Sequence, residues 1–87
     1  MNKERIKASK KFYRLHTYYT RGEMKDYLST VKLNFHLNSY MDLTIDDIVY
    51  YVENFKNLRE VKKDMLENYD YEYANSWYEN LIWVLAQ

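Results

Sequence analysis

The side chains that could do chemistry in this chain are few, and none of them forms a recognised catalytic pattern. The 87 residues include two histidines, His16 and His36, and no cysteine. The histidines do not have the spacing of two metal ligands on one turn of a helix. We therefore interpret each of them as a residue at the surface or at the margin of a core.

Carboxylates and hydroxyls give no stronger indication of catalysis. Asp46 and Asp47 are neighbours in the sequence, so on a helix they point in different directions and suit an N-terminal turn better than acid–base work. The serines lack a nucleophile motif, and the single glycine, Gly22, cannot build a phosphate-binding loop. We therefore expect no catalytic residue, no cofactor, no metal site and a protein that is not an enzyme.

Binding chemistry is better represented, beginning with positive charge at the start of the chain. Residues 1–21 carry seven Lys and Arg side chains and one acid. Successive residues turn about 100° on a helix, which places most of these cations opposite an apolar face. The predicted phosphate- or acid-binding stripe consists of Lys3, Lys7, Lys10, Arg14 and Arg21. Such a stripe could bind nucleic acid through its phosphates, but ordinary solvent-facing lysines give the same pattern.

The end of the chain combines acids with aromatic residues. Residues 64–87 contain five acids and no Lys or Arg, and the whole chain contains eleven tyrosines. Tyr and Trp are enriched at interface hot spots, and acids beside them would suit a basic partner. The predicted protein-binding surface consists of Tyr69, Asp70, Tyr71, Glu72, Tyr73, Tyr78 and Glu79. The alternative is a core helix whose polar edge is acidic.

Two helical segments are expected in the first half of the chain. The first covers residues 3–20, and Gly22 is well suited to end it because glycine readily adopts the left-handed conformation after a helix. The second covers residues 23–38, where apolar residues recur at helical spacing. Residues 31–37 also alternate between apolar and polar side chains, which is typical of a strand, so a short β segment is the alternative there.

The second half is expected to be helical as well. Thr44 followed by Asp47 is typical of a capping box at a helix N-terminus. The apolar pattern continues to about residue 68, as one helix or as two helices broken near residues 56–57. Asp70 is the expected N-cap of a last helix that ends near residue 86.

These elements predict an all-α fold, a compact small bundle of three to four helices in a single domain over residues 1–87. The absence of proline and the single glycine leave few tight turns. The last helix is apolar on nearly all sides, which indicates either central burial or a partner chain. If a second copy of the chain covers this helix, the expected homo-oligomer surface consists of Leu81, Ile82, Trp83 and Leu85.

The function expected from this sequence is a non-catalytic protein-binding module. Small, tyrosine-rich chains without motifs are typical of phages and mobile elements, so the expected partner is a host protein or nucleoprotein complex that the module inhibits. One alternative is a small nucleic-acid-binding regulator that uses the basic N-terminal helix, and another is an oligomeric structural or assembly component. The longest apolar run, Leu81–Ala86, is far shorter than the ~20 residues that span a bilayer. We expect a cytoplasmic protein, in the host cytoplasm if it is phage-encoded, with no membrane partner.

Overall fold

Five α-helices make up the part of the chain that the computed structural model describes, residues 2–34 and 43–87, and no strand occurs in these ranges. The helices are α1 (Lys3–Tyr18), α2 (Arg21–Asn34), α3 (Ile45–Asn54), α4 (Leu58–Asn68) and α5 (Tyr71–Leu85). The all-α class is confirmed. The expected number of three to four helices is too low. The apolar pattern that continues to about residue 68 belongs to two helices, α3 and α4, and not to one long helix.

The boundary between α1 and α2 differs from the expected one. Helix α1 ends with Tyr19 in an extended conformation as its C-cap, and Gly22 lies inside the first turn of α2 without a left-handed backbone. The cause is a capping box. The Glu23 N–H donates to the Thr20 hydroxyl at 3.2 Å, and the Thr20 N–H donates to the Glu23 carboxylate at 2.9 Å. These paired bonds start a new helix where a glycine cap was expected.

The segment that alternates over residues 31–37 is helical as far as the structure describes it. Helix α2 continues to Asn34, and Met24, Leu28 and Val31 point into the core at helical spacing. Residues 35–37, which include His36, lie outside the described residues. The helical interpretation therefore holds for residues 31–34.

Side-chain caps also determine where α3 and α4 begin. Thr44 and Asp47 form the expected capping box at the start of α3. Helix α4 begins after Asn57, whose side chain accepts the Glu60 N–H at 3.0 Å, while the Lys56 N–H donates to the Glu60 carboxylate at 2.9 Å. These local bonds satisfy donors at the N-terminus of α4, so the chain breaks at residues 55–57 rather than continuing as one helix.

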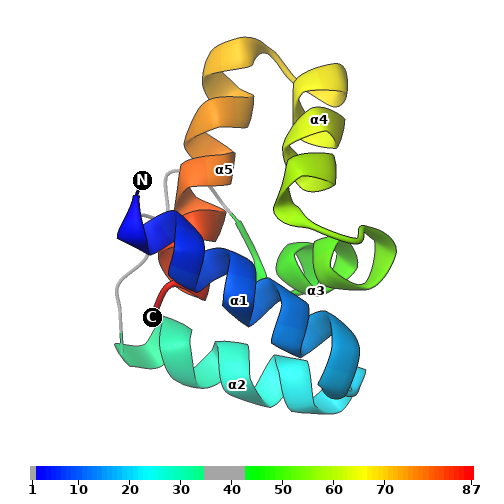
Figure 1. The fold of residues 1–87 in the computed structure, drawn as a ribbon, viewed down its shortest axis with the longest axis vertical. Helices are drawn as coiled ribbons and strands as arrows, with labels where there is room; N and C mark the ends of the chain where they lie inside the picture. Colours follow the sequence, from blue (N-terminus) through cyan, green and yellow to red (C-terminus); the bar gives the residue numbers. More distant parts are fainter. Residues whose placement is uncertain (1, 35–42) are drawn as a thin grey trace.

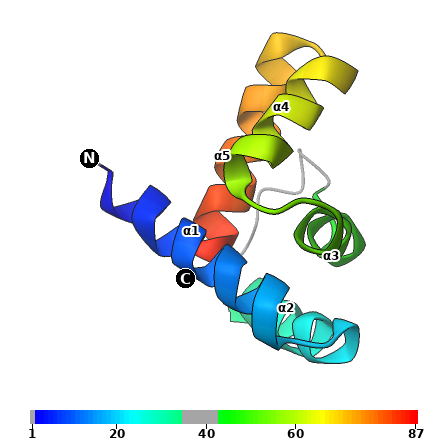
Figure 2. The ribbon, with the colours of Figure 1, turned by 45° about the vertical axis from the view of Figure 1, so that its right-hand side comes forward.

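The helices pack around one core, with α5 near its centre. Helices α4 and α5 form an antiparallel pair, and α1 crosses α5 (Figure 1). Helix α3 packs against both α1 and α2 (Figure 2). The largest fully buried side chains are Phe12 and Leu15 of α1, Leu28 of α2, Ile48 and Val52 of α3, Val61 and Met65 of α4, and Leu81, Ile82, Val84 and Leu85 of α5.

The central place of α5 corrects the predicted homo-oligomer surface. Leu81, Ile82 and Leu85 are 0–1% exposed inside the single chain, and Trp83 is half-buried. The apolar circumference of α5 is covered because α1 packs on one side of it and α4 on another. These leucine and isoleucine side chains therefore belong to the core of the single chain and are not exposed to a second copy.

Candidate binding surfaces

Buried side chains in the described part of the chain are all apolar or aromatic, so the candidate sites lie at the surface. His16 is exposed, and its Nδ1 lies 2.7 Å from the backbone oxygen of Val52. Residues 2–34 and 43–87 contain no group of three or more His, Cys, Asp and Glu side chains placed to hold a metal ion. The helices in these ranges are also too short or too polar to cross a membrane.

Four of the five residues of the predicted basic stripe lie together on the exposed face of α1. Lys3, Lys7, Lys10 and Arg14 are exposed, and none of them forms an ion pair with another described residue. A shallow cleft of about 300 Å³ lies beside them, between α1 and the end of α5. Lys11 lines this cleft and donates a hydrogen bond to the backbone oxygen of Gln87 at 3.0 Å.

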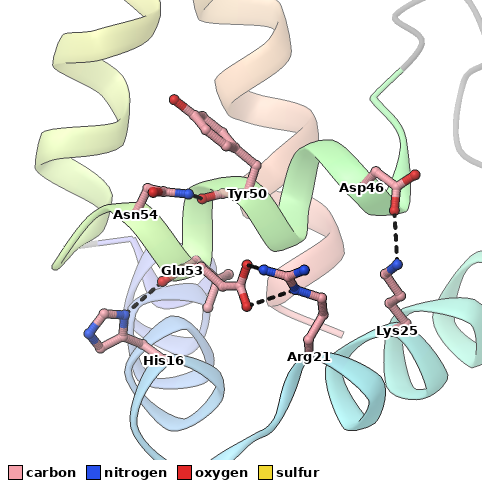
Figure 3. A network of polar contacts seen from close by, with 8 residues as sticks. His16, Arg21, Lys25, Asp46, Tyr50, Glu53 and Asn54 are labelled. Carbon is pink, nitrogen blue, oxygen red and sulfur yellow. Dashed lines mark hydrogen bonds and ion pairs between the residues drawn. The ribbon is translucent and has the colours of Figure 1, made fainter.

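The fifth predicted member, Arg21, is not part of this surface. It belongs to α2 and forms a two-bond ion pair with Glu53 of α3, with nitrogen–oxygen distances of 3.1 and 3.0 Å (Figure 3). The hydrogen bond to Glu53 and then its negative charge raise the pKa of Arg21. Lys25 and Asp46 lie beside this pair and join the same two helices at 3.5 Å. Arg21 therefore joins α2 to α3.

The predicted acidic and aromatic surface is divided between two sides of the molecule. Tyr69, Tyr71 and Tyr73 are exposed near the turn between α4 and α5, and Asp70 and Glu72 of the same segment are exposed as well.

The other two members of that prediction lie elsewhere. Tyr78 is only 6% exposed, and Glu79 forms an ion pair with Arg5 of α1. The prediction that Tyr78 is a surface residue is wrong, because its position on α5 faces α1 and α4. Burial raises the pKa of the Tyr78 hydroxyl above its ordinary value.

The structure brings six aromatic rings together across three segments. The centroid of the Trp77 ring lies 5.2 Å from that of Tyr69, 5.4 Å from that of Tyr73 and 6.1 Å from that of Tyr51. The Tyr51 ring is in turn 5.5 Å from Tyr50 and 6.0 Å from Phe55. These distances lie within the range of favourable ring pairs. The aromatic patch consists of Tyr50, Tyr51, Phe55, Tyr69, Tyr73 and Trp77.

Some rings of the aromatic patch are exposed to solvent, and others are buried beneath them. Tyr50, Tyr69 and Tyr73 are 52%, 43% and 37% exposed, whereas Tyr51 and Trp77 are buried. Burial is the main cause that raises the pKa of Tyr51 far above its ordinary value. The patch therefore presents three rings to solvent above an apolar base.

Carboxylates border this patch. The charges of Asp64 and Asp47 also raise the pKa of Tyr51, and Asp70 caps α5 by accepting the N–H of Tyr73 at 2.9 Å. None of these three acids forms an ion pair with a side chain of residues 2–31 and 43–87. The patch therefore combines exposed tyrosine rings with carboxylates that have no ion-pair partner among these side chains.

Sequence reasoning missed the contribution of α3 to this patch. Tyr50, Tyr51 and Phe55 were assigned no binding role, although the Tyr50–Tyr51 pair is visible in the sequence. Their meeting with Trp77 depends on how α3 packs near α5, which helical spacing within one segment does not determine.

Comparisons with known proteins give no family: no family model matches the chain, and neither the curated proteins nor the solved structures yield a match. The two candidate binding surfaces of this protein are therefore the exposed cations of α1 and the aromatic patch.

Proposed function

We propose that this protein is a non-catalytic protein-binding module and that the aromatic patch is its contact surface. The observation that carries the proposal is the support of exposed rings by buried ones: Tyr69 and Tyr73 rest on Trp77, and Tyr50 rests on Tyr51. Rings that are already held by their neighbours lose little conformational freedom on binding. Exposed tyrosines in such an arrangement are typical of interface hot spots.

The charges around the aromatic patch support a basic partner. Asp47, Asp64 and Asp70 have no ion-pair partner among the side chains of residues 2–31 and 43–87. A protein surface rich in Lys and Arg would complement these charges, and guanidinium groups also stack on tyrosine rings. We propose a host protein or nucleoprotein complex in the cytoplasm as the partner, whose basic groove this protein occupies and thereby inhibits.

Selection from a peptide display library tests this proposal. Peptides that bind the full chain are expected to be rich in Lys and Arg, and to lose binding to a Tyr69→Ala/Tyr73→Ala variant. The matched control is Tyr13→Ala/Tyr18→Ala, which removes two exposed tyrosines of α1 whose ring centroids are 6.3 Å apart. Enrichment that survives the patch substitutions, or that the control pair abolishes equally, contradicts the proposal.

A second candidate function is binding of nucleic acid through α1. The observation that favours it is the exposed row of Lys3, Lys7, Lys10 and Arg14, which has no ion pair among the described residues. Each phosphate that such cations neutralise steepens the fall of affinity with salt, by a slope of about 0.9 for duplex DNA.

Salt titrations of DNA and RNA binding test this second function. The Lys7→Glu/Lys10→Glu variant is expected to weaken binding and to flatten the salt dependence. The control is Lys56→Glu/Lys63→Glu, which makes the same charge change at two exposed lysines that do not belong to α1. Binding that is lost equally in both variants, or in neither, removes the α1 stripe from the mechanism.

A further inference from the structure

A hollow of about 500 Å³ lies where α1, α4 and α5 meet, and basic residues line it. Its lining residues come from α1, from the start of α4 and from α5, and α1 crosses α5 in the fold (Figure 1). The residues that matter for its chemistry are Arg5 and Ser9 of α1, Asn57, Arg59 and Lys62 at the start of α4, and Tyr78 of α5. None of them belongs to the aromatic patch or to the α1 stripe, so the hollow is a separate site.

The buried ring of Tyr78 holds two of these cations in place. The guanidinium carbon of Arg5 lies 5.6 Å from the ring centroid, and Nζ of Lys62 lies 5.1 Å from it. Both distances are within the range of cation–π attraction. A single aromatic ring therefore keeps two positive charges at the hollow in spite of their mutual repulsion.

Negative charge within the protein compensates this cluster only in part. Arg5 forms an ion pair with Glu79, whose side chain is 55% exposed. Arg59 and Lys62 form no ion pair with any residue in the described ranges. The hollow thus keeps two cationic groups whose charge an anionic ligand would neutralise.

We propose that this hollow binds a phosphate group, presented either by a small phosphate ester or by the backbone of a nucleic acid. Guanidinium groups match phosphate oxygens with two parallel hydrogen bonds, and an ammonium group adds a point charge. The Ser9 hydroxyl and the Asn57 amide, which both line the hollow, can donate to the remaining oxygens. The volume has room for a phosphate and part of the group that carries it.

Nuclear magnetic resonance titrations of the full ¹⁵N-labelled chain test the proposal at constant ionic strength. The probes are inorganic pyrophosphate and a short single-stranded oligothymidylate, with sodium chloride as the reference for salt alone. We expect the amides of Ser9 and Asn57 and the side-chain Nε of Arg59 to shift with at least one probe. Shifts with pyrophosphate identify a small phosphate ester as a sufficient ligand, and shifts with the oligothymidylate alone identify the nucleic-acid backbone.

Matched variants within α4 and just before it distinguish a specific site from general charge attraction. Arg59→Gln/Lys62→Gln removes two cations from the hollow and is expected to weaken phosphate binding by about tenfold or more. Lys56→Gln/Lys63→Gln removes two exposed cations near the hollow but outside its lining, and is expected to leave the affinity within about twofold. Equal losses in the two variants, or shifts that miss Ser9, Asn57 and Arg59, overturn the proposal. The proposed protein-binding function does not depend on either result.

Discussion

His16 of α1 donates a hydrogen bond from Nδ1 to the backbone oxygen of Val52 in the last turn of α3, at 2.7 Å (Figure 3). The acceptor is a carbonyl, so Nδ1 carries the proton. In a continuous helix the N–H of Lys56 would bond to this oxygen, but that N–H donates to Glu60 instead. His16 therefore satisfies a carbonyl that the end of α3 leaves open, and it ties α1 to α3.

Removing this donor is expected to destabilise the fold. His16→Phe keeps the ring that stacks on Phe12, at a centroid distance of 6.2 Å, and removes the hydrogen bond. We expect the free energy of unfolding in urea to fall by about 1 kcal/mol, the usual net value of one such bond. Thr17→Ala, at the exposed neighbour of His16, is the control. A His16→Phe protein that is as stable as the wild type contradicts this role.

The burial of α5 predicts that its leucines support the monomer. Leu81→Ala is expected to lower the free energy of unfolding by ~2–5 kcal/mol, because it leaves a cavity in the core. Ser76→Ala, on the exposed side of the same helix, should change it by less than ~0.5 kcal/mol. Light scattering should show that the folded fractions of both variants have the same molecular mass in solution as the wild type. The opposite finding is a wild-type assembly that Leu81→Ala dissociates without destabilising the subunit.

The buried residues Tyr51 and Tyr78 predict a loss of stability at alkaline pH. Burial raises the pKa of Tyr51 in the folded chain above the ordinary value of 10.0, so the unfolded chain releases this proton first. The contribution of Tyr51 is therefore complete below about pH 10 and is lost as the pH rises from there toward the folded pKa. The pKa of Tyr78 is shifted in the same direction, mainly by burial.

Urea unfolding at two pH values measures this effect. Tyr51→Phe cannot ionise, so the variant should lose less stability than the wild type between about pH 9 and about pH 11. Tyr78→Phe should behave in the same way, and the double variant should show the smallest loss. Equal losses in the wild type and in Tyr51→Phe would show that the Tyr51 hydroxyl does not contribute.

Local signals in the sequence were sufficient for much of the fold. Thr44 and Asp70 begin α3 and α5 as expected, because an N-cap depends on residues within one turn. The end of α1 was misjudged because two local signals compete there. The Thr20–Glu23 capping box, rather than Gly22, sets the boundary.

The binding surfaces depended on contacts between helices, and the sequence predicted them only in part. The face of α1 that carries Lys7 and Lys10 follows from helical spacing alone. The burial of Tyr78 and the meeting of Tyr51 with Trp77 depend on where α1 and α3 lie relative to α5. No pattern within a single segment contains that information.

The affinity of a selected Lys- and Arg-rich peptide, measured by calorimetry at fixed ionic strength, tests most directly whether the aromatic patch is the contact surface. We predict that Tyr50→Ala and Tyr69→Ala each weaken binding by ~2 kcal/mol or more, as expected of hot-spot tyrosines. The Lys7→Glu/Lys10→Glu variant should bind as tightly as the wild type or more tightly. A peptide that keeps its affinity for both tyrosine variants and loses it when α1 is altered would contradict the account.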